Sequence, residues 1–228
     1  MSRAVVLLSG GIDSTTVLSM VVPDLGAENV YTLSFNYGQA HRAELYSAGK
    51  VAKYYQVKEH HVLRLPAALL RWDLSALTGG AKLPHQKYGA LDLTEAGFSP
   101  TYVPFRNGTL ISLATAFALR RSCSRLYVGT HQSDEDSGVY PDCTADFIVA
   151  MGYAVWLGSA NHVLLLNPLQ SLTKTQIITL GLTRNAPYHL TRSCYSTGPL
   201  ACGRCPTCQE RLAAFEANNI DDPGRYQK

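Results

Sequence analysis

The sequence contains few charged residues and no long apolar run. Asp, Glu, Lys and Arg make up 16% of its 228 residues, against about 25% in an average globular protein. The longest apolar runs, such as residues 163–166, are far shorter than the roughly 20 residues that span a bilayer. We therefore expect no membrane-spanning helix. The hydrophobic content of 46% excludes a disordered chain.

The excess of positive charge is also small. Lys and Arg number 20 against 17 Asp and Glu, which gives a formal net charge of +3. An electrostatic nucleic-acid binder carries a larger basic excess, so we expect no direct nucleic-acid partner. The apolar residues 4–8 are too few for a secretory signal, which needs a longer apolar region and a small-residue cleavage site. We expect a cytoplasmic protein.

The chain is long enough for one domain, or for one domain and a small appendage. Short apolar runs alternate with helical patterns, which predicts an α/β fold with a parallel sheet. The predicted strands are residues 4–8, 31–36, 60–65, 125–130 and 162–167, and the predicted helices are residues 14–22 (ended by Pro23), 40–56, 110–121, 144–157, 173–181 and about 208–218. Residues 1–186 would form the main domain and residues 187–228 a tail. Residues 66–104 are irregular, which is typical of functional or mobile segments.

A glycine turn follows the first predicted strand and opens the first predicted helix. Its sequence is Ser9-Gly10-Gly11-Ile12-Asp13-Ser14. Backbone N–H groups at a helix N-terminus attract phosphate, and glycine lets the backbone approach a ligand closely. Asp13 would cap the helix or hold Mg²⁺ beside the phosphates. The turn matches neither a Walker A loop nor the dinucleotide fingerprint, and an ordinary strand-to-helix turn is the alternative.

Four of the six cysteines lie close together near the end of the chain. Cys194, Cys202, Cys205 and Cys208 have the spacing C-x₇-C-x₂-C-x₂-C. In a reducing compartment such a cluster indicates metal or redox chemistry before disulfides. Four thiolates suit a structural, tetrahedral Zn²⁺. A redox pair of Cys205 and Cys208, or an Fe–S cluster, is the alternative, and Cys123 is expected to be an ordinary core thiol.

The glycine turn resembles the pyrophosphate loop of the N-type ATP pyrophosphatases, and other segments narrow the resemblance. The segments 191–195 and 202–211 look like the zinc element of the 7-cyano-7-deazaguanine synthase family. Four further segments are similar to segments of that family: FNYGQAHRAE at 35–44, VPFRN at 103–107, SGVYPDC at 137–143 and LTKTQII at 172–178. The resemblance extends from Val5 to about Phe215, which is nearly the whole chain.

This resemblance implies a doubly wound parallel sheet with ATP at the carboxyl ends of the strands. It also implies a ligase that converts 7-carboxy-7-deazaguanine and ammonia into 7-cyano-7-deazaguanine, for queuosine- or archaeosine-type 7-deazapurine biosynthesis. Adenylation would turn a carboxylate oxygen into a leaving group, ammonia would then give the amide, and a second adenylation would lead to the nitrile. ATP, Mg²⁺ and Zn²⁺ are the expected cofactors, and a homodimer is the expected assembly.

The resemblance also implies roles for individual residues. The residues that would bind ATP are Leu8, Ser9, Gly10, Gly11, Asp13, Ser14 and Thr15. The catalytic residues would be Asp13, Lys174 and Arg106. The residues that would bind the substrate are Tyr37, Gln39, His41, Arg106, Asn107, Asp134, Asp136 and Asp142. Lys174 would neutralise charge on the phosphates, and Arg106 would hold a carboxylate or phosphate through its bidentate fork. The alternatives are a solvated lysine, a surface arginine beside a helix cap, and solvated acids at 134–142.

Three departures from the family pattern fall where the substrate should bind. Val139 is an extra residue within SGVYPDC, Thr144 follows Cys143 where the family often has Arg, and Ala40 stands before His41 where Arg often sits. The acceptor therefore stays open between ammonia and another amine, including one on a protein. The rival functions are a tRNA sulfur-transfer enzyme of the same superfamily and a zinc-bearing module that binds ATP without turnover.

Overall fold

Five parallel strands form one sheet in the computed structural model, which describes residues 2–39, 43–131 and 140–227. The strands are β1 (Ala4–Leu7), β2 (Val30–Asn36), β3 (Glu59–Arg64), β4 (Arg125–Tyr127) and β5 (Leu164–Leu166), in the order β3-β2-β1-β4-β5. The chain progresses in opposite directions from β1, so the predicted doubly wound sheet is confirmed. β1 and β2 are central and almost wholly buried, which explains their largely apolar sequences.

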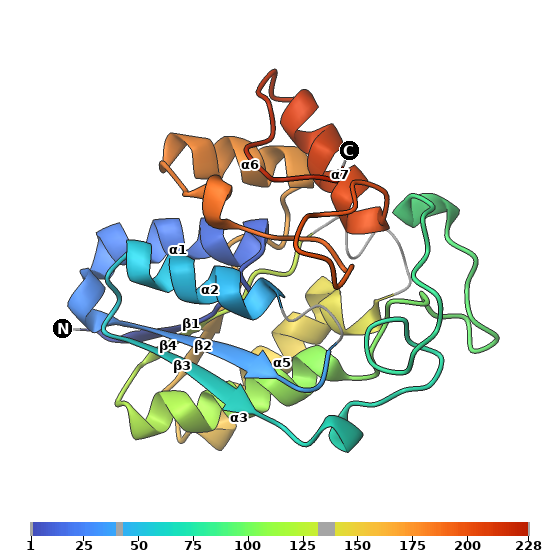
Figure 1. The fold of residues 1–228 in the computed structure, drawn as a ribbon. Coiled ribbons are helices and arrows are strands. Elements are labelled where there is room, and N and C mark those ends of the chain that lie inside the picture. The colour runs from blue at the N-terminus through green and yellow to red at the C-terminus, as the bar shows by residue number, and fades with distance from the viewer. Residues whose placement is uncertain (1, 40–42, 132–139, 228) are drawn as a thin grey trace.

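Helices cover both faces of the sheet (Figure 1). One face is covered by α1 (Ile12–Leu25), α2 (Ala43–Tyr54) and α6 (Lys174–Thr183). The other face is covered by α3 (Arg106–Arg120) and α5 (Ala145–Gly158). Alternate residues of β1 face the two layers, with Val6 in the first core and Val5 in the second. The short 3₁₀ turns are η1 (Ala27–Asn29), η2 (Ala67–Leu69), η3 (Tyr88–Ala90), η4 (Pro141–Cys143) and η5 (Tyr188–Leu190).

The predicted elements are present, but several ends differ. The prediction that Pro23 ends the first helix is wrong, because α1 continues to Leu25. Pro23 lies in the last turn, where its missing N–H removes only one helical hydrogen bond. α3 begins at Arg106 rather than at residue 110, so this arginine lies in the first turn of a helix. β4 and β5 are shorter than predicted, at three residues each.

The irregular residues 66–104 lie beyond the carboxyl ends of β2 and β3, in teal and green in Figure 1. Their own small core is aromatic, with Trp72, Phe98 and Tyr102 in edge or tilted ring contacts. Tyr88 and Tyr140 join this cluster. The segment therefore forms a wall at the edge of the sheet where the loops after the strands gather.

The tail packs on the rest of the molecule. α7 (Pro206–Glu216) lies against α6, and Phe215 is buried in the same core as α1. Ala201 and Tyr226 form an isolated parallel bridge that fastens the end of the chain to the cysteine loop. A domain boundary at residue 186 stays a prediction. No helix within the described ranges is long and apolar enough to cross a membrane.

Candidate active site

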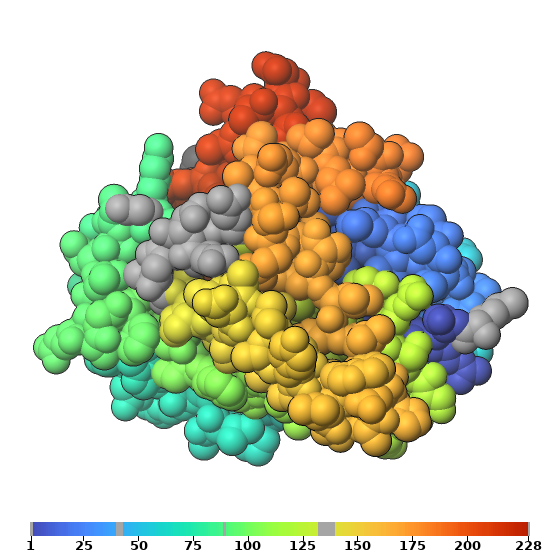
Figure 2. Space-filling model, turned by 180° about the vertical axis from the view of Figure 1, so that it is seen from behind, coloured from blue at the N-terminus to red at the C-terminus, as the bar shows by residue number. Residues whose placement is uncertain are grey.

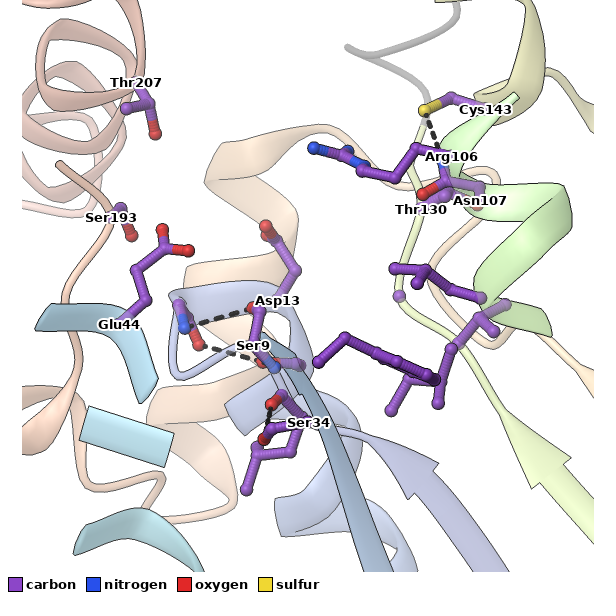
Figure 3. A pocket seen from close by; sticks show the side chains of 18 of the residues that line it. Ser9, Asp13, Ser34, Glu44, Arg106, Asn107, Thr130, Cys143, Ser193 and Thr207 are labelled. Atoms are coloured by element: carbon purple, nitrogen blue, oxygen red, sulfur yellow. Dashed lines mark hydrogen bonds between the residues drawn. The ribbon is translucent and has the colours of Figure 1, made fainter. Parts of the chain in front are cut away.

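A cavity of about 270 Å³ opens at the carboxyl ends of β1, β2 and β4. Its volume is near the lower end of ligand pockets, roughly 300–1,000 Å³. The glycine turn lies at its centre, the start of α3 on one side, and α2 with the tail on the other (Figure 3). This is the crevice at the topological switch point, where open α/β sheets bind their ligands.

The two glycines of the turn have different surroundings. Gly10 has a φ of +90°, and a Cβ there would lie 2.3 Å from the Glu44 carbonyl oxygen and 2.6 Å from the Ala48 nitrogen. Only glycine allows that backbone conformation and that approach of α2. Gly11 lines the cavity, and a Cβ there would meet its nearest neighbour at 3.5 Å. Gly10 therefore serves packing against α2, and Gly11 faces the ligand space.

Serine hydroxyls hold the turn in shape. Ser14 Oγ lies 3.1 Å from Ser9 Oγ and accepts a hydrogen bond from the Ser9 N–H at 3.2 Å. Gly11 is the N-cap of α1, and no described side chain caps that end, so the first-turn N–H groups are suited to an anion. Leu8 lines the cavity beside the turn, whereas Thr15 is fully buried within the packing of α1.

Lys174 lies at the centre of a cluster of polar side chains. Its Nζ is 2.6 Å from Asp13 Oδ1, 2.8 Å from His131 Nε2 and 3.6 Å from Glu210 Oε2. Asp13 thus pairs with Lys174, while Gly11 occupies the N-cap position. Because an ammonium group only donates, His131 Nε2 accepts, and the neutral ring carries its proton on Nδ1.

Burial and neighbouring charge set the protonation of this cluster. Burial alone would raise the pKa of Asp13, but Lys174 and His131 outweigh it and hold this pKa below its usual value. Burial, reinforced by Lys174, lowers the pKa of His131 to about 4. Burial raises the pKa of Glu210, and Lys174 offsets only part of that effect. Near neutral pH the cluster therefore contains the Asp13 carboxylate and a neutral imidazole, and Lys174 forms ion pairs with Asp13 and Glu210.

Arg106 lies across the cavity, in the first turn of α3 (Figure 3). Burial would lower its pKa, but Tyr37 and Asp142 raise it, so the guanidinium stays charged. Asn107 N donates to Asp142 Oδ2 at 2.8 Å, and Asn107 Nδ2 donates to Asp142 O at 3.1 Å. Asn107 Nδ2 is also 3.2 Å from Cys143 Sγ. These contacts anchor the helical turn from which Arg106 extends.

The loop after β2 brings Tyr37 and Gln39 to the cavity. Gln39 Oε1 accepts from the Tyr37 N–H, and Gln39 Nε2 donates to the Phe35 carbonyl, both at 2.9 Å. Gln39 therefore fixes the shape of this loop as well as lining the site. The predicted substrate residues His41, Asp134 and Asp136 lie outside the described residues.

Two cavity residues next to Lys174 escaped the sequence analysis. His131 comes shortly after β4, at the ligand-binding edge of the sheet, and this position is a signal that was available in the sequence. Glu210 lies in α7, far along the chain from the glycine turn, and no local pattern connects it with Lys174. The remaining polar or aromatic lining residues that were not singled out include Glu44, Tyr88, Thr101, Thr130, Ser193, Tyr195 and Thr207.

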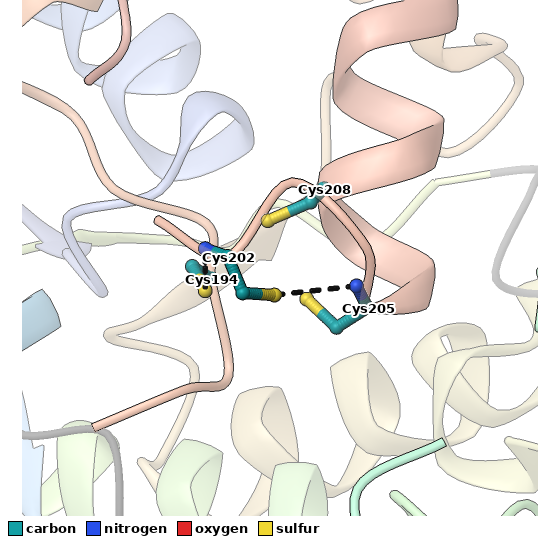
Figure 4. A group of neighbouring side chains, drawn as sticks. All are labelled: Cys194, Cys202, Cys205 and Cys208. Atoms are coloured by element: carbon teal, nitrogen blue, oxygen red, sulfur yellow. Dashed lines mark hydrogen bonds between the residues drawn. The ribbon is translucent and has the colours of Figure 1, made fainter. Parts of the chain in front are cut away.

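The four cysteines of the tail converge on one point (Figure 4). Their sulfur atoms all lie within 4.8 Å of one another, and all four residues are buried. Four sulfurs bound to zinc at about 2.3 Å would stand about 3.8 Å apart, so the arrangement fits a tetrahedral Zn²⁺. The backbone N–H groups of Cys202 and Cys205 donate to the sulfurs of Cys194 and Cys202 at 3.2 and 3.3 Å. Such hydrogen bonds orient ligands around a metal.

Comparison with known proteins identifies the family. A family model described as queuosine biosynthesis protein QueC matches residues 3–219. The chain belongs to the QueC family. It is 40% identical to a 7-cyano-7-deazaguanine synthase of Nostoc sp. strain PCC 7120, over 98% of the chain and 97% of the relative. The enzyme of that name from Acetivibrio thermocellus is 39% identical over 100% of the chain and 99% of the relative.

Solved structures support the fold of this QueC-family chain. NMN synthetase from Francisella tularensis matches with a TM-score of 0.52 at 14% identity, over 96% of this chain and 78% of that one. The U34-tRNA thiolase NcsA from Methanococcus maripaludis, solved with its [4Fe-4S] cluster, matches with a TM-score of 0.51 at 14% identity, over 95% and 67%. At such identity the likeness concerns the fold alone.

The family and the assignment to queuosine biosynthesis that the sequence predicted are thereby confirmed. In this QueC-family chain the predicted residues Asp13, Lys174 and Arg106 line one cavity. Asp142 is buried and contacts Asn107 at the start of α3. The catalytic, ATP-binding and substrate-binding roles of individual residues stay predictions.

Proposed function

We propose that the protein converts 7-carboxy-7-deazaguanine, ammonia and ATP into 7-cyano-7-deazaguanine. The observation that carries this proposal is a cavity in which the glycine turn at the start of α1 faces the charged Arg106. The relatives named 7-cyano-7-deazaguanine synthase, which match the chain from end to end, support the same reaction. A nucleotide at one end of the cavity and a carboxylate at the other would meet between them.

At the nucleotide end, the first-turn N–H groups of α1 would bind the phosphates of ATP, together with Ser9, Gly11 and Ser14. Lys174 would turn from Asp13 towards the phosphates and neutralise the charge that develops there. Asp13 would then offer a carboxylate to Mg²⁺, whose preferred ligands are oxygen atoms. When bound, the metal would neutralise charge on the leaving pyrophosphate.

At the acceptor end, Arg106 would hold the carboxylate of the deazaguanine acid through its bidentate fork. Tyr88 and Tyr195, whose hydroxyls lie 3.0 Å apart, line the cavity nearby and offer flat apolar surface to a purine-like ring. Asn107 would act mainly by anchoring the first turn of α3. Gln39 would act in the same way on the loop that carries Tyr37.

The reaction would use two activations of the same kind. The carboxylate oxygen attacks the α-phosphorus of ATP and pyrophosphate leaves; ammonia then displaces AMP and gives the amide. The amide oxygen attacks a second ATP and pyrophosphate leaves again; the nitrogen then loses both of its protons and AMP leaves with the former amide oxygen, which gives the nitrile. Both activations need an oxygen held in line with the α-phosphate, so catalysis rests on positioning and charge stabilisation.

We further infer that Cys194, Cys202, Cys205 and Cys208 hold a structural Zn²⁺. A four-cysteine site leaves no open coordination position for a substrate. None of the six cysteines forms a disulfide, which suits a reducing compartment and supports a cytoplasmic location. Metal analysis of the purified protein should find about one zinc per chain; iron in its place would favour the cluster alternative.

A homodimer would use the exposed face of α5, which lies on the lower back of the molecule in yellow (Figure 2). Val149, Tyr153 and Leu157 repeat every four residues there and are 58%, 68% and 71% exposed. The charged residue of this helix is Asp146, in its first turn. An apolar face without charge meets its own copy across a two-fold axis without repulsion. A standard interface needs about 800 Å² per partner, roughly 7% of the 11027 Å² of accessible surface.

Light scattering after gel filtration tests this assembly. Tyr153→Lys together with Leu157→Glu should convert a dimer into a monomer. The matched control is Tyr54→Lys on α2, where the side chain is 52% exposed, and this variant should stay dimeric. A dimer that survives the α5 double substitution would place the interface elsewhere.

A pyrophosphate-release assay tests the reaction. The protein should release pyrophosphate from ATP only when 7-carboxy-7-deazaguanine is added, and mass spectrometry should detect the nitrile when ammonia is the amine. A product that carries another amine would keep the adenylation and change the acceptor. Release without the acid, or none with it, would contradict the proposed reaction.

A further inference from the structure

Three segments far apart in the sequence surround the ammonium group of Lys174. Asp13 comes from the glycine turn at 2.6 Å, His131 from the loop after β4 at 2.8 Å, and Glu210 from α7 at 3.6 Å. A lysine ammonium has three N–H donors, so each of these acceptors has a donor to face. Glu210 brings a second carboxylate to the cation.

The tail fixes the position from which Glu210 extends. α7 begins directly after Cys205, which is its N-cap, and carries Cys208 in its first turn. On the other side of Glu210, the buried Arg211 pairs with Asp222 at 2.7 Å. The start of α7 is therefore held by the cysteine cluster and by a buried ion pair, and Glu210 lies between these two attachments.

We propose that Glu210 is a positioning residue that acts on Lys174. The inference rests on the proposed function of the cavity. Without Glu210, the ammonium group would be drawn towards Asp13 and the glycine turn. Glu210 attracts the same cation from the side of the tail, so the ammonium group is held between the two carboxylates, at the point from which it would reach the phosphates. The cysteine cluster thus contributes to catalysis through the helix that it anchors.

The charge of Glu210 has opposite effects on binding and on turnover. A carboxylate in the cavity repels the polyphosphate of ATP, so its removal should favour the bound nucleotide. The same removal lets Lys174 shift towards Asp13 and away from that point, so the chemical step should become slower. A variant that merely loosens the site would weaken binding and turnover together, which separates a positioning role from a general structural one.

Glu210→Gln tests this inference, because it removes the charge and keeps the shape. We expect kcat for acid-dependent pyrophosphate release to fall about tenfold, with a lower KM for ATP. Glu210→Asp should recover part of kcat. The control is Glu216→Gln, an exposed glutamate at the end of the same helix, which should behave as the unmodified protein. Zinc content and the thermal midpoint should be unchanged in all three variants.

A kcat within twofold of the unmodified protein, or a KM for ATP that does not fall, would overturn the inference; so would loss of zinc from Glu210→Gln. Calorimetric titration with a non-hydrolysable ATP analogue separates this inference from the proposed reaction. If acid-dependent turnover is missing in the unmodified protein, the reaction is wrong, yet Glu210→Gln should still bind the analogue at least twofold more tightly than Glu216→Gln does. Equal affinities would count against Glu210 itself.

Discussion

The two ends of the cavity hold their cations differently. At the nucleotide end, Lys174 is paired directly with Asp13 at 2.6 Å. At the acceptor end, Arg106 extends from a helical turn that is held in place by the hydrogen bonds from Asn107 to Asp142. In the proposed reaction the first arrangement would exchange one ionic partner for another when phosphates bind. In the second, the contacts that anchor the helical turn are not those that would bind the ligand, and the Arg106 guanidinium lies beside the Tyr37 hydroxyl. Substitutions at the two ends should therefore fail in different ways.

The largest effect is expected at the nucleotide end. Asp13→Ala removes the partner of Lys174 and the carboxylate proposed for Mg²⁺, so pyrophosphate release should fall by about 10³-fold or more. Asp13→Asn should fall nearly as far, because the amide keeps the shape but not the charge. Steady-state release assays at saturating acid measure both. A loss below tenfold would remove the glycine turn from the chemistry and erase the difference between the two ends.

A smaller effect is expected at the acceptor end, and it should concern the acid rather than ATP. Arg106→Lys keeps the charge but loses the bidentate fork. The loss of one charged hydrogen bond, about 1.5–3 kcal/mol, should lower kcat/KM for the acid by 10- to 100-fold while the KM for ATP stays nearly constant. Titration of each substrate in turn measures the two constants. An equal rise in both KM values would show that Arg106 serves the whole cavity.

The features that sequence alone was able to predict are those formed by residues close together in the chain. The glycine turn is contiguous and follows a recognisable strand, so its residues and their place at the sheet edge were predicted together. The cysteine cluster was equally local, because its spacing already suits one metal ion. Cys123 was expected in the core and is buried.

The rest of the site depends on contacts that no local pattern records. His131 and Glu210 reach Lys174 only after β4 and α7 have been placed by the sheet and by the tail. The start of α3 was predicted too late because the first turn carries Arg106 and Asn107, and Asp142 stabilises it from another segment. Periodicity identifies the apolar part of a helix but not an N-terminus held by a distant carboxylate.

Substitutions of the two glycines separate the packing role of the glycine turn from its proposed role in nucleotide binding. Gly10→Ala places a side chain at a positive φ and within 2.3 Å of the α2 backbone, so the free energy of unfolding should fall by at least about 2 kcal/mol. Gly11→Ala has room, with φ of −84° and no neighbour closer than 3.5 Å among the described residues, and should change stability by less than about 1 kcal/mol. Its methyl group would instead enter the cavity and weaken nucleotide binding. Urea unfolding and calorimetry separate the two, and equal losses of stability would contradict the division.

The smallest effect concerns the charge pattern around Lys174. The pKa of His131 is lowered to about 4, against about 6.5 in an unfolded chain, so between these values the unfolded protein binds more protons than the folded protein. The stability contributed by the neutral ring is therefore complete above about pH 6.5 and is lost as the pH falls towards 4. Linkage gives a loss of about 1 kcal/mol between pH 7 and pH 5.5.

Urea unfolding at both pH values should show this part of the pH dependence in the unmodified protein and not in His131→Gln. His85→Gln, at an exposed histidine, should keep it. An unchanged pH dependence in His131→Gln would mean that the ring accepts a proton beside Lys174. Below about pH 6.5 the nucleotide end would then carry a second cation, and the contrast with the Arg106 guanidinium at the acceptor end would be one of charge as well as of anchoring.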